Sequence, residues 1–438
     1  MATIYSFLRN VFLDIRQETR SNYAFLPFLL VLITVPMRYA YNSIAIGLFI
    51  GISLLTFRKQ HFKLEKALLI PIALYVLMVC SLLWTEDPEA TRKALFKVFP
   101  LLLVPICYLV NKSFSSQQVR KIITYFGYSY FVFAVFYIVR AVFRFFQTQI
   151  TDVFFYHELV TADVNAIHVS IYMAIAYFSI LTKPNKIVFD RVILFFFVML
   201  IVLLSSKNVI VVFFVLNGVY MFYHSEIRNR KRILLMVLGF GLLSSALFFQ
   251  KIKKRFEIEI ASNMNDRTIN PEISSTQRSV YNATIKEAWT METFNQNYFF
   301  PGTALRVYQF RIFLEMMQEH PAYLTGYGLN ATHHKIKEKR IQHDLYEGYD
   351  QFNFHNQYIQ FFAEIGVFGF LLILVMVFYN LKNALLSKDF TYISFAILMI
   401  SLFLTESFLS RQRGVIFFIA LYCFFNTHKT ISPKTEGE

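Results

Sequence analysis

Apolar residues along this chain gather in long blocks, which short polar and basic segments separate. Several blocks approach about 20 residues, the length that a helix needs to cross a hydrocarbon layer of about 30 Å. The pattern predicts an all-α, polytopic membrane protein with about twelve transmembrane helices and one large loop outside the membrane. The predicted spans centre on residues 27–36, 44–55, 67–83, 99–109, 123–142, 167–181, 192–204, 209–222, 233–249, 358–378, 392–404 and 415–425.

Lysine and arginine in the short connections predict the orientation of these spans. One set of alternate connections is rich in them: Arg58, Lys59, Lys63 and Lys66; Lys112, Arg120 and Lys121; Lys183, Lys186 and Arg191; Arg228, Arg230, Lys231 and Arg232; Lys382 and Lys388. The opposite set is poorer and holds Arg38, Arg92, Lys93, Lys207, Arg411 and Arg413. By the positive-inside rule, the first set and both termini are expected to be cytoplasmic.

This orientation divides the chain into three parts. Residues 1–250 are predicted to form an N-terminal transmembrane bundle of about nine helices. Residues 251–354 form a large, partly helical periplasmic loop, and residues 355–438 form the C-terminal transmembrane helices with a short cytoplasmic tail,.

The large loop contains one clear helical pattern, over residues 305–317. Phe310, Phe313, Leu314 and Met317 fall on one face of this predicted helix, and Pro321 stops the pattern,.

The N-terminal segment is expected to lie in the membrane interface. It carries charged residues without a continuous apolar stretch, which is not the pattern of a signal peptide,. Leu8, Val11, Phe12 and Ile15 recur at helical spacing, as in a short amphipathic helix,.

Composition supports a membrane protein. Of 438 residues, 56% are hydrophobic and 16% are charged, whereas a soluble domain carries about 25% charged residues. The net charge of +15 comes largely from basic clusters between apolar blocks, so membrane topology explains it better than nucleic-acid binding does,. Cys80, Cys107 and Cys423 lie inside apolar blocks and indicate neither a disulfide framework nor a metal site,.

Histidines in and just after the large loop invite a metal site, at His320, His333, His334, His343 and His355. No pair has the HExxH arrangement, and the loop has no cysteine,. Walker, dinucleotide-binding and GxSxG signatures are absent from the sequence as well,. We therefore expect no metal and no cofactor.

His355 differs from the other histidines by its position, where polar loop becomes apolar helix. At about 100° per residue, Phe362, Gly366 and Gly369 are expected on the same helical face. The two glycines would let a neighbouring helix approach closely and hold the histidine at the membrane surface. Glu364 points to the opposite side and needs a partner inside the membrane.

His355-Asn356, then nine residues, then Gly366-Val367-Phe368-Gly369 resembles the His-[Asn/Ser/Gln]-x9-Gly-x-x-[Gly/Thr/Tyr] signature of O-antigen ligases. Their superfamily also holds O-antigen polymerases and bacterial O-linked oligosaccharyltransferases. Further stretches are similar to family motifs: Arg306, Phe310 in place of a tryptophan, His320-Pro321, Gly326-Tyr327-Gly328, and Ser205-Ser206-Lys207-Asn208 with lysine in place of arginine.

The resemblance implies an enzyme of the bacterial inner membrane whose site faces the periplasm. Its donor would be a glycan on a polyprenyl diphosphate, and its acceptor a hydroxyl group of lipid A core or another glycan. The resemblance makes His355 the catalytic base, for which a histidine pKa near 6.5 is suitable. The candidate substrate-binding residues are Arg306 and Lys207, then Arg311, Arg411, Arg413 and Asn356, with Gly366 and Gly369 structural,.

Several alternatives remain at this point. O-antigen ligation is the primary hypothesis, and an O-antigen polymerase or a protein O-oligosaccharyltransferase shares the same donor chemistry. A transporter or flippase of lipid-linked glycan is the rival of another class. A single histidine at a helix start is usually a cap or interface residue, and a loop arginine is often only solvated.

Overall fold

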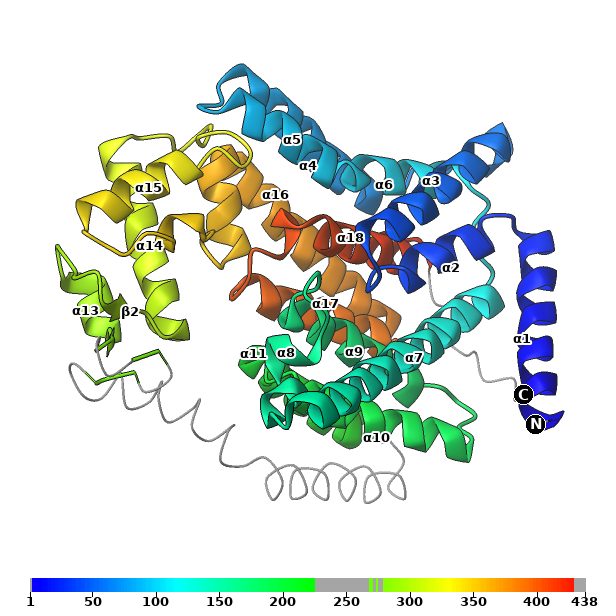
Figure 1. Cartoon of the computed structure of the whole chain (residues 1–438). Helices are drawn as coiled ribbons and strands as arrows, with labels where there is room; N and C mark the ends of the chain where they lie inside the picture. The colour runs from blue at the N-terminus through cyan, green and yellow to red at the C-terminus, as the bar shows by residue number, and fades with distance from the viewer. Residues whose placement is uncertain (1, 225–267, 271–272, 275–278, 429–438) are drawn as a thin grey trace.

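The computed structural model describes residues 2–224, 268–270, 273–274 and 279–428, and it is mostly helical there (Figure 1). The longer helices are α1 (Ala2–Ser21), α2 (Phe25–Ile33), α3 (Tyr39–Leu55), α4 (Lys66–Cys80), α5 (Pro88–Val98), α6 (Pro100–Val110), α7 (Ser116–Thr148), α9 (Ala166–Leu181), α10 (Val188–Leu203), α11 (Lys207–Val219), α14 (Gly302–Glu319), α15 (His333–Gln342), α16 (Gln357–Ser387), α17 (Phe390–Phe403) and α18 (Gln412–Thr427). Shorter elements are η1 (Lys59–His61), η2 (Ser81–Leu83), η3 (Thr151–Phe154), α8 (Tyr156–Leu159), η4 (Tyr220–His224), α13 (Ile285–Thr290), η5 (Tyr349–Gln351), η6 (Phe408–Ser410) and two parallel strands, β1 (Tyr281–Asn282) and β2 (Tyr298–Phe299).

Each predicted span within the described residues coincides with a helix, which confirms the all-α prediction in its general form. Five helical stretches are long and apolar enough to cross a membrane: Lys66–Leu83, Pro88–Val110, Ser116–Thr148, Lys207–His224 and Gln357–Ser387. Three further apolar helices are shorter: Tyr39–Leu55, Ala166–Leu181 and Phe390–Phe403. The total of about twelve crossings and the inward termini stay predictions.

The fourth predicted span, 99–109, is too short. In the structure α5 leads directly into α6 through Phe99, and together they form one stretch of 23 residues. The span predicted at 233–249, the basic cluster from Arg228 to Arg232 and the boundary at residue 250 lie outside the described residues.

The bundle is built around α9 and α18, whose residues are buried along almost their whole lengths. α7, α10 and α17 pack on α9, while α6 and α4 pack on α18. Several tyrosine hydroxyls inside this core donate hydrogen bonds, which lowers the cost of burying them,. Tyr177 donates to Asn217 Oδ1 at 2.7 Å, and Tyr422 donates to the carbonyl oxygen of Ala67 at 2.9 Å.

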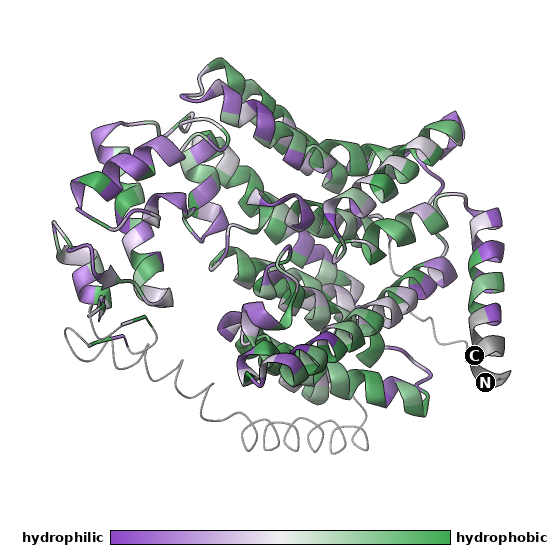
Figure 2. Ribbon diagram, viewed as in Figure 1, coloured by the Kyte–Doolittle hydropathy of each residue, from purple (hydrophilic) through white to green (hydrophobic). Residues whose placement is uncertain are grey.

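A second, smaller core holds α13, α14 and α15 together at the end of the bundle that Figure 1 draws at the left. Hydrophilic residues dominate α15, in contrast to the bundle helices (Figure 2). The helix predicted at 305–317 is confirmed as α14, which ends at Glu319 with His320 as its C-cap, just before Pro321. Tyr308, Ile312 and Met316 form its buried face.

α7 and α9 lie in close contact at Gly127. A Cβ atom there would lie 2.5 Å from Ser179 Oγ and 2.7 Å from Ile180 Cδ1. We therefore expect Gly127→Ala to destabilise the protein by about 1–3 kcal/mol, because it overpacks this contact. Thermal unfolding of the purified protein in detergent measures the effect as a lower Tm.

Gly47→Ala is the matched control, since a Cβ at Gly47 would meet nothing within 4 Å. Alanine gains up to about 1 kcal/mol over glycine inside a helix, so the Tm of this variant should not fall. Equal losses in the two variants would contradict the proposed packing.

Candidate functional site

His355 lies in the short segment that leads from η5 into α16. Its backbone adopts the left-handed conformation, with φ +44°, and its N–H donates to Asn353 Oδ1 at 3.0 Å. The imidazole ring lies beside Phe352, with 5.8 Å between ring centroids, and the side chain is 23% exposed. The loop that contains His355 therefore holds its side chain at the edge of the bundle.

Asn356 begins the next helix. Its Oδ1 accepts hydrogen bonds from the N–H groups of Tyr358 and Ile359, so it is the N-cap of α16,. Its Nδ2 donates to the carbonyl oxygen of Leu404 at 3.2 Å, which links the cap to the end of α17. Asn356 thus fixes where the chain leaves His355.

The side chain that His355 approaches is Glu406, which lies between α17 and η6 and is 10% exposed. Glu406 Oε1 lies 3.5 Å from His355 Nδ1 and 3.9 Å from Arg306 Nη2. At 3.5 Å the contact with His355 is an ion-pair approach, and neither ring nitrogen has a well-aligned hydrogen bond among the described residues,. One buried carboxylate therefore faces both the candidate base and a candidate cation.

Burial alone raises the pKa of the Glu406 carboxyl, because it disfavours the charged form,. The contact with His355 and the electrostatic influence of His168 and Arg306 outweigh burial, so the pKa of Glu406 lies below its ordinary value. The ionised carboxylate beside Nδ1 favours the tautomer with hydrogen on Nδ1. Nε2 is then the basic nitrogen.

Arg306 comes from the first turns of α14. Its Nε donates to the carbonyl oxygen of Thr405 at 3.1 Å, and its Nη1 donates to that of Gly302 at 2.8 Å. The side chain stays 35% exposed. The guanidinium group is therefore oriented by backbone while part of it still faces outward.

The turn before α11 also contacts the segment that carries Glu406. Asn208 Nδ2 donates to Thr405 Oγ1 at 2.7 Å and to the carbonyl oxygen of Ser401 at 2.8 Å. Lys207, the neighbouring residue, begins α11 and is half-buried. Residues 404–406 thus receive contacts from three distant parts of the chain, which bring Arg306 and the Lys207 turn towards His355.

The other predicted cations lie elsewhere. Arg311 Nε pairs with Glu315 Oε1 at 2.7 Å, and its Nη1 donates to the carbonyl oxygen of Met291 at 2.6 Å. Glu315 also meets His343 Nε2 at 3.1 Å. Burial raises the pKa of Glu315, but the hydrogen bonds from His343 and Arg311 outweigh it and lower the pKa to about 2. This cluster stabilises the core of α14 and α15.

Arg413 is buried inside the bundle, where it donates to backbone oxygens of Met37 and Asp163 and stacks on the ring of Tyr39. Arg411 is exposed. Neither guanidinium group contacts His355, Arg306 or Glu406 within the described part of the chain.

α16 is interrupted at Ile365 and Gly366, and the second of these residues has φ +67°. The turn predicted at Gly326-Tyr327-Gly328 fills the interruption. The N–H groups of Tyr327 and Gly328 donate to the carbonyl oxygens of Ala363 and Glu364, both at 2.9 Å. Inside the interrupted helix, the Glu364 carboxylate accepts from Gln360 Nε2 at 2.7 Å.

This interruption corrects the prediction for the two glycines. His355 lies outside α16, so it shares no helical face with Gly366 and Gly369. A loop, not a helix, approaches Gly366: a Cβ there would lie 2.1 Å from the carbonyl oxygen of Leu324. At Gly369 a Cβ would meet the side chain of Ile365 from the same helix, at 2.8 Å.

An apolar groove of about 640 Å³ opens beside the site. The predicted face of α14 forms one wall, with Phe310, Phe313, Leu314 and Met317. The other lining residues come mainly from α16 and α17: Gln318, Tyr323, Asn356, Tyr358, Ile359, Phe362, Phe370, Leu374, Phe378, Ile400 and Leu404. Asn356 and Leu404, which are hydrogen-bonded to each other, place one end of this groove next to His355.

Sequence reasoning missed Glu406. The available signal was one carboxylate directly after the apolar stretch 390–404 and before another apolar helix. Among the described residues, no three His, Cys, Asp or Glu side chains gather as a metal ion would require.

Residues 192–374 match a family model described as O-antigen ligase. The matched segment contains Lys207, Arg306 and His355, while Glu406 follows its end. The match confirms the predicted resemblance to the O-antigen ligase superfamily, and it supports a membrane glycosyltransferase of the ligase or polymerase type in general. The chain matches no individual curated protein.

If the turn at 326–328 fills the break in α16, Gly366→Ala should disrupt it. The added Cβ would require a positive φ and would collide with Leu324,. We expect faster hydrogen–deuterium exchange at the amides of Tyr327 and Gly328, because they lose their acceptors in α16. Mass spectrometry of peptides that cover 323–328 measures this.

The matched control is Gly348→Ala. Gly348 also has a positive φ, of +120°, but its nearest neighbour would lie 3.8 Å from the new Cβ. This variant should leave exchange at 323–328 unchanged. If Gly366→Ala also leaves it unchanged, the assigned contact is wrong.

Proposed function

Starting from the O-antigen ligase domain that residues 192–374 match, we propose that this chain is a glycosyltransferase of the bacterial inner membrane. It transfers a glycan from polyprenyl diphosphate to an acceptor hydroxyl at the periplasmic face, and the acceptor is the lipid A core. The observation that carries the proposal is the approach of His355 and Arg306 to the buried carboxylate of Glu406, next to an apolar groove.

In the proposed step, the oxygen of the acceptor hydroxyl attacks the anomeric carbon of the donor sugar. A new glycosidic bond forms, and the bond from that carbon to the diphosphate oxygen breaks. The hydroxyl proton passes to His355 Nε2, and polyprenyl diphosphate leaves with the bonding electrons. A positioned base of this kind contributes roughly 10²–10⁴-fold to the rate.

Glu406 is a positioning residue in this scheme. Its contact with Nδ1 orients the imidazole and stabilises the imidazolium that forms when Nε2 takes the proton,. Because the pKa of Glu406 lies below its ordinary value of 4.5, the carboxylate stays ionised at neutral pH.

Arg306 and Lys207 are proposed to meet the charge that develops on the departing diphosphate. Arg306 suits this role because its outward N–H groups form a rigid fork that matches two phosphate oxygens,. Lys207 would add a point charge from the neighbouring turn. Asn356 is proposed to contact substrate at the point where the groove meets the site.

The groove supports a donor with an apolar carrier. Its walls are formed almost entirely by aromatic and aliphatic side chains of α14, α16 and α17, and such a surface suits an isoprenoid chain. With the carrier there, the diphosphate would reach the end of the groove that Asn356 occupies, beside Arg306 and His355.

A polymerase or a protein O-oligosaccharyltransferase would use the same donor half of the reaction. Deleting the gene separates a ligase from a polymerase, because a ligase deletion leaves long chains on the carrier lipid and a polymerase deletion leaves single repeats on the core. A transporter or flippase is the remaining alternative. Transfer by the purified protein without any gradient favours the enzyme.

We expect His355→Ala to lower transfer by roughly 10²-fold or more, because the reaction loses its base. The measurement is in vitro transfer from a defined polyprenyl diphosphate glycan, with lipopolysaccharide gels from complemented cells beside it. His333→Ala is the control, since His333 is exposed and lies at the start of α15. Normal transfer by His355→Ala would remove the base assignment.

We expect Glu406→Gln to lower kcat by roughly ten- to a hundred-fold with little change in KM, since a contact with a charged partner contributes about 1.5–3 kcal/mol. Glu406→Asp should retain part of the activity.

The pKa of Glu406 is lower in the folded protein than its ordinary value of 4.5, so the ionised carboxylate stabilises the folded state,. This stabilisation is fully present above pH 4.5 and is lost as the pH falls through the lowered pKa,. The Tm of the wild type should therefore fall more steeply below pH 4.5 than that of Glu406→Gln.

A further inference from the structure

α1 runs across one end of the bundle, at the right in Figure 1, whereas α14 and α15 lie at the other end. The helices of the bundle, such as α3, α7 and α18, run between these two ends in the same view. A helix in this position lies along a membrane surface when the bundle crosses the membrane. α1 is therefore far from the candidate active site and needs an explanation of its own.

Acidic side chains attach α1 to the bundle. Lys121 Nζ of α7 lies 2.5 Å from Asp14 Oδ1 and 2.6 Å from Glu18 Oε1, and Tyr125 also donates to Asp14. Nearer the end of α1, Gln118 Nε2 donates to Ser21 Oγ at 2.8 Å. These contacts fix the rotation of the helix about its own axis.

That rotation turns three arginines outward. At about 100° per residue, Arg9, Arg16 and Arg20 fall within about 40° of one another on the helix. Asp14 and Glu18 lie roughly 140–180° away from Arg9. All three arginines are exposed, and none has an ion-pair partner among the described residues.

Two large apolar side chains flank this row of arginines. Phe12 is 65% exposed and Leu13 is 45% exposed. A soluble surface helix would rarely present both next to three unpaired cations. Exposed apolar side chains beside exposed cations occur on helices that lie in a membrane interface.

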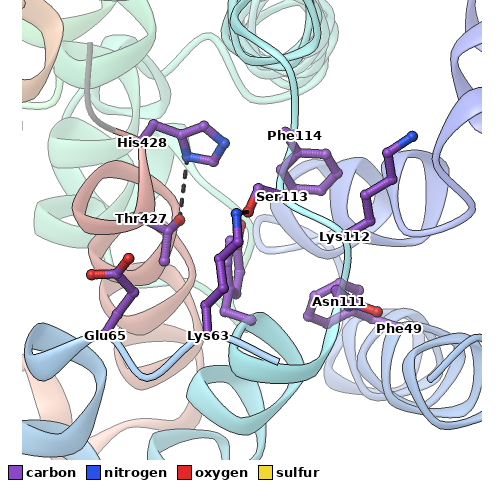
Figure 3. Close-up of a pocket in the computed structure, with 10 residues that line it drawn as sticks. Phe49, Lys63, Glu65, Asn111, Lys112, Ser113, Phe114, Thr427 and His428 are labelled. Carbon is purple, nitrogen blue, oxygen red and sulfur yellow. Dashed lines mark hydrogen bonds between the residues drawn. The ribbon is translucent and has the colours of Figure 1, made fainter. Parts of the chain in front are cut away.

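A small pocket lies near the end of α1 (Figure 3). Two lysines, Lys63 and Lys112, line it together with Glu65, and Lys63 Nζ lies 3.4 Å from Ser113 Oγ. Lys112 Nζ donates to the carbonyl oxygen of Ser21, the last residue of α1. The cations of the pocket and of α1 thus belong to one end of the molecule.

We propose that the outer face of α1, defined by Arg9, Phe12, Leu13, Arg16 and Arg20, binds the anionic phospholipids of the leaflet opposite the candidate active site. The guanidinium groups pair with the phosphates of these lipids. Charge complementarity selects acidic over zwitterionic lipids at this face.

The test uses the full-length protein and native mass spectrometry. The protein is exchanged into an equimolar detergent mixture of phosphatidylglycerol and phosphatidylcholine, and the retained lipids are counted. We expect preferential retention of phosphatidylglycerol, and we expect the variant R9Q/R16Q/R20Q to lose this preference by roughly ten-fold or more, since each basic residue near an anionic surface contributes about five-fold.

Two further variants control the experiment. R9K/R16K/R20K keeps the charges and should keep most of the preference. R92Q/K93Q/K97Q removes the same number of exposed cations from α5 and should leave it unchanged. Equal retention by R9Q/R16Q/R20Q and the wild type, or an equal loss in the α5 variant, would overturn the proposal, as would binding of a soluble acidic protein or a second copy in place of lipid.

Discussion

Glu406 keeps a negative charge largely out of water, and the groups around it must balance that charge,. His355 comes from the segment before α16, and Arg306 comes from α14. Because both face the same oxygen atom, the carboxylate decides how α14 and the bundle meet at this point. Removing either partner would leave a buried charge with less compensation, so the three side chains act as one unit.

Backbone hydrogen bonds at the break in α16 support this arrangement of His355, Arg306 and Glu406. A continuous α16 would satisfy the carbonyl oxygens of Ala363 and Glu364 internally, but the helix breaks at Gly366 and exposes them. The 326–328 turn supplies the missing N–H donors. The interruption is therefore a docking point for the segment that follows α14, and it ties the helix that carries Arg306 to the helix that Asn356 caps.

Patterns within one segment could be predicted from the sequence. Apolar blocks gave the helices, the spacing of Phe310, Phe313 and Met317 gave the groove-lining face of α14, and the Gly-x-Gly turn was recognised as a turn. Contacts between segments could not be predicted. Nothing near Glu406 in the sequence points to His355, and periodicity does not reveal the left-handed residue that interrupts α16.

Contacts between segments also decide which of the candidate arginines can bind a phosphate, so the sequence alone did not separate them. Arg311 is only 12% exposed and donates its N–H groups to Glu315 and to backbone oxygens. Arg413 is buried and paired with backbone inside the bundle. Arg306 differs because backbone contacts orient it while 35% of its side chain remains exposed. An arginine that is oriented yet incompletely paired has already lost part of the conformational entropy that ligand binding would otherwise cost, and it still has donors for a phosphate.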